Sequence, residues 1–363
     1  TCDNPPLAAH RDSMHRIINP IRTSKGIPWG TLRATLIVSM GGFLFGFDAS
    51  VISGVIGFVG PAFQLSDLQM GLVVSSPSFS AMFAMIVAGR MSDRFGRKPT
   101  LAVIATLYTV SALLSALAPG IGWLVSARML GGVAFGAALI LAPLYIAEIS
   151  PPAWRGRLVS IQQLNIVLGF SAAYFSNYLM VKGMVPDATG LTGAGGVAVW
   201  RWMLGIEVAP ALLFLGLLCR IPESPHWLRL KGRLEEMRRS VHRLGQRLDE
   251  GADANAPPAG GPGAGSEATL AERLKELTGG RFRKIFVMAM LLGLSQQITG
   301  INAVFFYAPV IFSRSGFGLD ASLAQAVVVG LVNLVFTVLA IGLIDRIGRR
   351  PLLLWGLVGI TVS

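Results

Sequence analysis

Three charged residues stand inside stretches that are otherwise almost free of charge: Asp48, Arg128 and Glu207. An ionised side chain within an apolar helix is costly to bury, so such residues are functional candidates by default. A carboxylate held by an arginine in a dry bundle takes up a proton when motion separates the two groups. Asp48 and Arg128 therefore indicate either a proton-binding switch or a static ion pair. Glu207 either tunes Asp48 or is an outward-facing acid near Arg201.

Side-chain amides form the second chemically distinctive set in these stretches. They both donate and accept hydrogen bonds, which suits a neutral polyhydroxyl ligand, and aromatic rings suit the apolar faces of such a ligand. The alternative for a lone amide is a hydrogen bond between helices, worth about 0.6–2 kcal/mol in membranes. The amides are Gln162, Gln163, Asn165, Gln296, Gln297, Asn302 and Asn333.

The spacing of the amides in 296–302 predicts a break in their helix. At about 100° per residue, a regular helix would not direct Gln296, Gln297 and Asn302 to one ligand. Gly300 lies between them, where an interruption brings them together, as in the discontinuous helices of transporters.

The stretches that carry these residues are long enough to cross a membrane. Hydrophobic residues make up 53% of the 363 residues, charged residues only 14%, and mean hydropathy is +0.61. A soluble protein carries charge on roughly a quarter of its residues, and a membrane span needs about 20 mostly apolar residues. The sequence therefore predicts an all-α membrane protein with eight complete spans and the beginning of a ninth at 351–363. The eight lie within 34–66, 68–89, 99–127, 129–147, 158–181, 202–219, 285–313 and 321–344.

The basic residues predict the orientation of the chain. With the N-terminus in the cytoplasm, all Lys and Arg residues except Arg128, Lys182, Arg201 and Arg314 lie on the inside, as the positive-inside rule requires. We therefore expect a multi-pass protein of the cell membrane, embedded in the lipid bilayer. The net charge of +12 resides in loops and not on one face, which argues against nucleic-acid binding.

An internal repeat divides the chain. The pattern D-R-x-G-R-[KR]-P occurs at 93–99 and again at 345–351, which predicts two homologous bundles. We assign 1–32 to a cytoplasmic tail, 33–219 to a six-helix bundle, 220–284 to a cytoplasmic linker with short helices at 227–248 and 270–277, and 285–363 to a partial second bundle. If the halves match, roughly three spans of the second are absent from this sequence, and we expect a C-terminally truncated chain that does not transport.

The charged residues of the repeated loops are candidates for gating. Ties between helix ends stabilise one conformation and break in another, although these charges also suit a purely topogenic role. Glu148 and Arg155 flank the neighbouring helix end and predict a salt bridge between loops. The full set of gating candidates is Asp93, Arg97, Lys98, Glu148, Arg155, Asp345, Arg349 and Arg350, to which the motif at 222–225 adds Glu223.

From residue 41 to residue 355, the sequence resembles the major facilitator superfamily and, within it, the sugar porter family. The resemblance rests on GGFLFGFD at 41–48, the two repeated loops, Arg128, YIAE at 145–148 with RG at 155–156, and WRW at 200–202. It rests most specifically on PESP at 222–225 and QQITGIN at 296–302. It implies the major facilitator fold and a monomer that imports a monosaccharide with protons by alternating access, without a cofactor or metal.

The resemblance also implies roles for individual residues. An acid at the position of Asp48 marks proton symporters of the bacterial xylose type, with Arg128 as its partner, and Glu207 resembles an acid of some proton-coupled members. Phe170 and Phe306 depart from the pattern, replacing a glutamine and a tyrosine of relatives, so the particular sugar stays open. The implied sugar contacts are Phe45, Gln163, Gln296, Gln297, Asn302 and Asn333.

The alternatives to sugar–proton symport are uncoupled sugar diffusion, a sugar sensor and an enzyme. Uncoupled sugar diffusion would leave Asp48 structural, and a sugar sensor would add a signalling tail. An enzyme is disfavoured because no nucleophile–base pair, phosphate loop or metal spacing occurs, and Cys2 and Cys219 lie too far apart to indicate a metal site.

Overall fold

The computed structural model describes residues 26–184, 198–246 and 283–362, except for the side chains of Asp345 and Arg349. The regular structure within these ranges is helical. Eight segments are long and apolar enough to cross a membrane, which confirms the predicted number of spans. The expected short helix at 270–277 lies outside the described residues.

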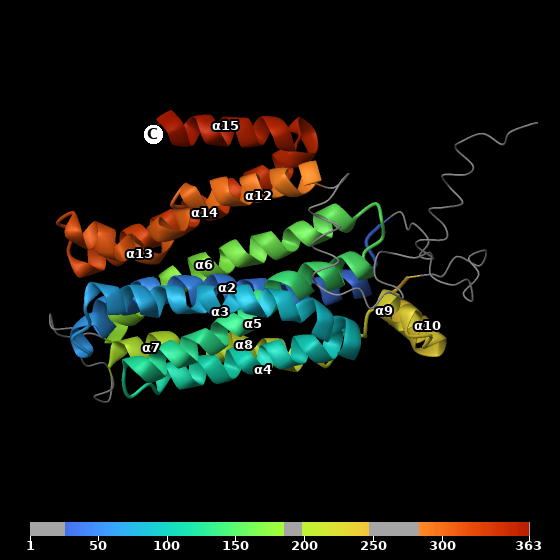
Figure 1. Ribbon diagram of the computed structural model, residues 1–363, viewed down its shortest axis with the longest axis horizontal. Coiled ribbons are helices and arrows are strands. Elements are labelled where there is room, and N and C mark those ends of the chain that lie inside the picture. Colours follow the sequence, from blue (N-terminus) through green and yellow to red (C-terminus); the bar gives the residue numbers. More distant parts are fainter. Residues whose placement is uncertain (1–25, 185–197, 247–282, 363) are drawn as a thin grey trace, which may run out of the picture.

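The helices of the first part of the chain run side by side along one direction (Figure 1). The short helices α9 and α10 lie at the end of this bundle where α2 begins, which we call the linker end. The elements are α2 (Trp29–Ala62), α3 (Asp67–Phe95), α4 (Arg97–Ala116), α5 (Ile121–Ile149), α6 (Arg155–Met184), α7 (Val199–Gly205), α8 (Val208–Leu218), α9 (Pro225–Leu230) and α10 (Leu234–Arg243). They are followed by α12 (Arg283–Ile298), α13 (Ile301–Arg314), α14 (Leu319–Ile347) and α15 (Arg349–Val362).

Glycine turns join the helices at both copies of the repeated loop. Gly96 separates α3 from α4 with φ 105° and ψ 162°, and Gly348 separates α14 from α15 with φ 90° and ψ 162°. A side chain is strained in this region of φ, so glycine is the residue that allows the sharp turn. The two loops therefore share a backbone conformation as well as a sequence.

Glycines also set the closest helix pairs of the bundle, α2 with α6 and α3 with α5. A Cβ atom on Gly46 would overlap the carbonyl of Ile166, and one on Gly169 would overlap that of Phe43. Gly136 packs in the same way, because its Cβ would lie 2.6 Å from the carbonyl oxygen of Ala81. Small residues allow backbones to approach closely where lipid provides no hydrophobic driving force between helices.

Two of the predicted spans are interrupted. The sixth is divided into α7 and α8 around Ile206 and Glu207. The seventh is divided into α12 and α13 at Gly300, which adopts the left-handed conformation with φ 73°. The predicted break at Gly300 is confirmed.

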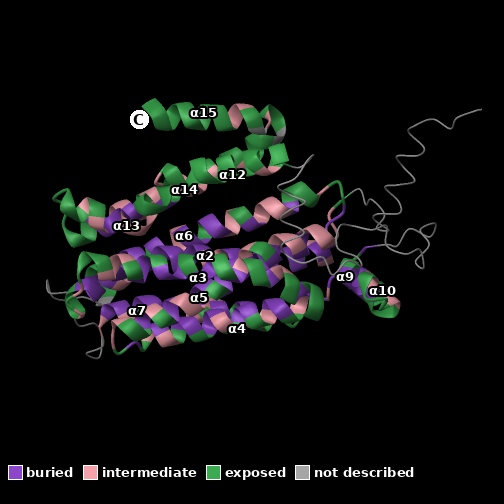
Figure 2. Ribbon diagram, in the orientation of Figure 1, coloured by how far each residue is buried: buried purple, intermediate pink, exposed green. Residues whose placement is uncertain are grey.

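The second part of the chain meets the first through two helices, since α13 packs on α2 and α14 packs on α6. Tyr174 on α6 donates a hydrogen bond to the carbonyl of Phe305 at 2.6 Å, and Ser171 donates one to that of Gly330 at 2.9 Å. In contrast, α12 and α15 are mostly exposed (Figure 2).

Candidate functional site

Asp48 and Arg128 form an ion pair in the middle of the bundle. Nη1 of Arg128 donates to Oδ1 of Asp48, and Nη2 donates to the Asp48 carbonyl at 3.3 Å. Asp48 is 4% exposed and Arg128 is 2% exposed. Residues far apart in sequence meet here because α2 and α5 pack together. A buried pair of this kind is strongly disrupted when one partner is removed, because the other charge then lacks compensation.

Glu207 is the third member of this buried group. It is 3% exposed, lies at the break between α7 and α8, and is close enough to Asp48 and Arg128 to interact electrostatically with both. Oδ2 of Asp48 is buried without a hydrogen-bond partner among the described residues. Two adjacent carboxyl groups hydrogen-bond to each other only when one of them carries a proton, so Glu207 is a candidate donor for this oxygen.

The alternative prediction, that Glu207 is an outward-facing acid near Arg201, is wrong because Glu207 is buried. The Arg201 guanidinium instead donates to the carbonyl of Ala116 at 3.1 Å and to that of Ala118 at 2.9 Å. These bonds close the C-terminal end of α4, so Arg201 has a structural role at the end of the bundle opposite the linker end.

Aromatic rings line the region around Phe45 on α2. The ring centroid of Phe45 lies 4.9 Å from that of Phe135 and 6.4 Å from that of Phe170. Phe170 in turn lies 5.4 Å from Phe305 on α13. The rings thus connect the two parts of the chain, and Phe170 lies between Phe45 and Phe305 in this aromatic cluster.

The predicted amides fall into separate groups. Nδ2 of Asn302 donates to Oε1 of Gln297 at 2.9 Å, so the break at Gly300 does bring these two residues together. Gln296 is exposed on α12, Gln163 is exposed on α6, and Asn333 is half-buried on α14. The structure gives no contact that joins Gln163 to the amides of α12 and α13 in this conformation.

Arg97 is the centre of a charged network at the linker end. Its Nε donates to both carboxylate oxygens of Glu148, at 3.1 and 3.0 Å, and its Nη2 donates to Oε1 at 2.7 Å. Its Nη1 donates to Asp93 at 2.9 Å and to the carbonyl of Ser92 at 3.0 Å. The planar guanidinium therefore ties the ends of α3, α4 and α5 together with charge-assisted hydrogen bonds.

Glu223 caps the N-terminus of α4. Its carboxylate accepts hydrogen bonds from the backbone N–H of Arg97 at 3.0 Å, of Lys98 at 3.2 Å and of Ser224 at 2.8 Å. A Cβ atom on Gly96 would lie 2.5 Å from Oε2 of Glu223, so the glycine turn also leaves room for this carboxylate. Burial raises the pKa of Glu223 above its ordinary value, although the three N–H groups and Arg97 oppose that shift.

The other gating candidates have different environments from those expected. The predicted bridge between Glu148 and Arg155 is wrong, because Glu148 pairs with Arg97 and Ser224 while Arg155 is exposed. The side-chain Nζ of Lys98 donates to the carbonyl of Cys219 at 3.2 Å, whereas its backbone N–H is the group that contacts Glu223. In the second repeat, Arg350 is exposed, and the side chains of Asp345 and Arg349 lie outside the described part.

Sequence reasoning did not assign three residues that complete this network. Ser224 hydrogen-bonds to Glu148 and also caps α9. The indole of Trp227 donates to the carbonyl of Asp93 at 3.0 Å, and the hydroxyl of Tyr145 donates to that of Pro222 at 2.8 Å. Ser224 was recognisable as a helix cap because a proline follows it. Trp227 and Tyr145 carried no such signal.

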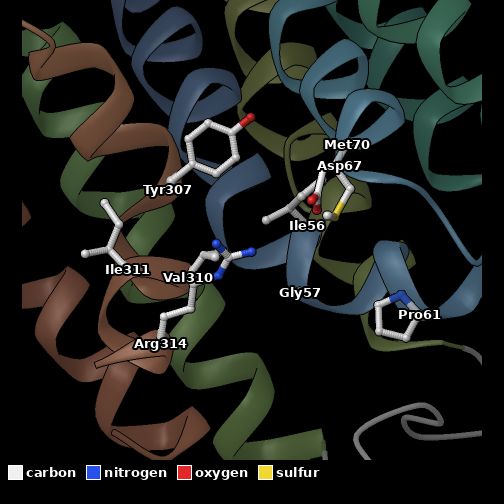
Figure 3. Close-up of a pocket in the computed structure, with 9 residues that line it drawn as sticks. All are labelled: Ile56, Gly57, Pro61, Asp67, Met70, Tyr307, Val310, Ile311 and Arg314. Atoms are coloured by element: carbon white, nitrogen blue, oxygen red, sulfur yellow. The ribbon is translucent and has the colours of Figure 1, made fainter. Parts of the chain in front are cut away.

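A pocket lies where α13 meets α2 and α3, at the end of the bundle opposite the linker end (Figure 3). Asp67 and Met70 line it from α3, and Tyr307 and Arg314 line it from α13. The guanidinium of Arg314 points toward the side of the pocket that carries Asp67. The first and second parts of the chain thus present opposite charges to one pocket.

The arrangement matches known transporters. The family model described as "Sugar (and other) transporter" matches residues 34–363. The arabinose-proton symporter of Bacillus subtilis is 36% identical over 86% of this chain and 65% of its own length. The D-xylose-proton symporter of Escherichia coli is 33% identical over 91% of this chain and 70% of its own length.

Solved structures give the same result. The xylose transporter XylE of E. coli, in a partially occluded inward-open conformation, superposes with a TM-score of 0.71 at 32% identity. That match covers 89% of this chain and 72% of the solved chain. This chain therefore spans about two thirds of the length of its relatives. It belongs to the sugar transporter family, as a multi-pass membrane protein with the all-α major facilitator fold.

Proposed function

We propose that the protein imports a monosaccharide together with protons by alternating access. The observation that carries this proposal is the buried group of Asp48, Arg128 and Glu207. Two acids beside one base, shielded from water, provide a place where one proton is gained or lost at the centre of the bundle. The relatives named as symporters of arabinose, xylose and galactose with protons support this assignment.

Proton coupling follows from the geometry of the ion pair. While Arg128 holds Asp48, the guanidinium compensates the charge of the carboxylate. Movement of α5 relative to α2 would separate the charges, and Asp48 would then bind a proton in place of the guanidinium. A proton on Glu207 would supply a donor to the unpartnered Oδ2 of Asp48 in the paired state. Protonation therefore biases the equilibrium between two arrangements of the bundle.

Sugar binding is assigned to the aromatic and amide groups near α2, α6 and α12–α14. The Phe45 ring packs against an apolar sugar face, and amides bind the hydroxyls. Phe170 removes one polar contact beside Phe45, which favours a sugar that needs fewer hydrogen bonds on that side. The amide contacts are proposed to be Gln163, Gln296, Gln297, Asn302 and Asn333.

The protein is proposed to lie in the cell membrane as a monomer. Its linker end is proposed to face the cytoplasm. Its loops carry most of the basic residues, as the positive-inside rule requires. The division into a first bundle at 33–219, a linker at 220–284 and a second bundle from 285 follows the repeated loops. Opening and closing would then act on the ties that Arg97, Glu148 and Glu223 make between helix ends.

The decisive experiment compares proton-driven accumulation with sugar exchange. The protein expressed from the full reading frame is purified and reconstituted into proteoliposomes. Uptake of arabinose, xylose and galactose is then measured with and without an inward proton gradient. We expect accumulation that a protonophore abolishes. Asp48→Asn should lose accumulation and keep exchange, whereas Glu235→Gln, at an exposed acid of α10, should retain both. Uptake that is indifferent to the protonophore would instead identify uncoupled diffusion.

A further inference from the structure

The side chain of Gln162 on α6 is buried without hydrogen-bond partners. It is 4% exposed, and neither its Nε2 nor its Oε1 meets a donor or acceptor. Asn165, one turn further along α6, differs, because its amide donates to Ser39 Oγ at 2.9 Å and to the Ile161 carbonyl at 3.1 Å. A buried polar group without a partner costs about 1–3 kcal/mol, so an unpaired amide calls for an explanation.

The surroundings of Gln162 leave room for its amide. A Cβ atom on Gly42 of α2 would lie 2.6 Å from Nε2, so the glycine accommodates the amide in this position. The same side chain lines a cavity between α5 and α6, which we call the α5–α6 cavity, with Leu139 and Pro143 on one wall and Val159 and Gln163 on the other. The residue therefore lines an open space while its amide stays buried toward Gly42, next to the exposed side chain of Gln163.

We propose that Gln162 is a further specificity-determining residue, whose amide binds a hydroxyl group of the sugar when the sugar occupies the α5–α6 cavity next to Gln163. This inference rests on the proposed sugar transport. A rotation of the Gln162 side chain away from Gly42 brings its amide into the cavity. There the sugar hydroxyl supplies the donor and acceptor that the protein does not.

The chemistry of the cavity favours a neutral polyhydroxyl ligand. Its walls are apolar apart from the two glutamines, Ser160 and Arg155 at the linker end. Neutral amides donate and accept at once, which matches a hydroxyl and gives no preference for an ion. The cavity lies toward the linker end, so Gln162 would act on the cytoplasmic part of the sugar's path.

The test uses sugars that each lack one hydroxyl. In proteoliposomes that hold the full-length protein, equilibrium exchange is measured for the sugar that the wild type transports best and for its monodeoxy analogues. Gln162→Met removes the amide and keeps the length of the side chain. We expect this variant to exchange the parent sugar with about tenfold lower apparent affinity. It should also no longer distinguish the parent from one particular analogue, and its melting temperature should not fall, because no protein hydrogen bond is lost.

Two matched variants separate this role from a structural one. Asn165→Leu removes an amide that has protein partners, so it should lower the melting temperature and leave discrimination among the analogues unchanged. Gly42→Ala should displace the Gln162 amide toward the cavity, where it is proposed to bind the sugar, and should therefore retain discrimination among the analogues. If Gln162→Met ranks all analogues as the wild type does, or mainly loses stability, then the amide serves an internal water and the inference is overturned. If the wild type exchanges no monosaccharide, it is the proposed function that fails.

Discussion

Asp48 on α2 and Arg128 on α5 form an ion pair in which both side chains are at most 5% exposed. The guanidinium contacts both the carboxylate and the backbone carbonyl of Asp48. The pair therefore holds α2 and α5 together at one point in the bundle. Because charge is costly to bury alone, any motion that parts these helices must be accompanied by a change in protonation.

Glu207 should be replaceable by a neutral hydrogen-bond donor. The amide of Glu207→Gln donates to Asp48 as a protonated acid would, whereas Glu207→Leu leaves Oδ2 of Asp48 without a partner. We expect uptake driven by a proton gradient to persist in the Gln variant and to be roughly tenfold slower in the Leu variant. Initial rates in proteoliposomes measure this difference, with Glu235→Leu on exposed α10 as the control. Equal rates in the Gln and Leu variants would contradict the hydrogen-bond role.

Arg97 should not tolerate lysine. Arg97→Lys keeps the charge but loses the planar fork that contacts Glu148 and Asp93 together. We expect a loss of about 2 kcal/mol in stability, visible as a lower melting temperature in detergent. Arg90→Lys, at an exposed position of α3, should leave the melting temperature unchanged. A melting temperature equal to that of the wild type in Arg97→Lys would show that charge alone maintains the network.

Glu223 should make stability depend on pH. Its pKa in the folded protein is raised above the ordinary value of 4.5, chiefly by burial, so the folded state binds this proton more tightly than the unfolded state. Its contribution to stability is therefore fully present below the unfolded pKa and is lost as the pH rises through the folded pKa. Relative to Glu223→Gln, the wild type should become less stable as the pH rises through this window.

Melting temperatures of both proteins, recorded in steps upward from about pH 4, measure this difference. Glu235→Gln, at an exposed carboxylate of α10, serves as the control. A difference between wild type and Glu223→Gln that is constant with pH would show that Glu223 does not titrate differently on unfolding.

Asp67 and Arg314 should influence closure of the pocket between α3 and α13. Asp67→Arg places like charges across that pocket, and their repulsion disfavours the arrangement in which the two parts meet. We expect Gly57→Cys, in a background without other cysteines, to react several-fold faster with an impermeant thiol reagent when Asp67→Arg is added. The double exchange Asp67→Arg with Arg314→Asp should reverse this effect. Identical labelling in all variants would exclude an electrostatic contribution.

The spans, their number and the interruption at Gly300 were predictable from local sequence. Uncharged runs longer than a membrane is thick have one stable form, because a helix satisfies every backbone group internally. Gly300 was identifiable because amides on both sides of it needed a common direction. The two loops that contain Gly96 and Gly348 were recognisable from the repeat, whereas their shared backbone conformation was decided by the structure.

Partners within the sites were less predictable. Glu148 was expected to pair with Arg155, which is near in sequence, but it pairs with Arg97, which reaches it from α4. The environment of Glu207 was left open and was decided by the break between α7 and α8, which places it beside Asp48. Gln162 and Gln163 are adjacent in sequence, yet one is buried and the other exposed.

By itself, the sequence determined that the chain spans a membrane, how many spans it has, and which rare polar residues lie within them. These properties depend on hydropathy, charge and glycine content, which are local. Only the tertiary structure decided which acid meets which base and which amide lacks a partner. Those outcomes depend on how α2, α5, α6 and the α7–α8 break rotate and pack against each other, and side chains far apart in sequence specify that packing jointly.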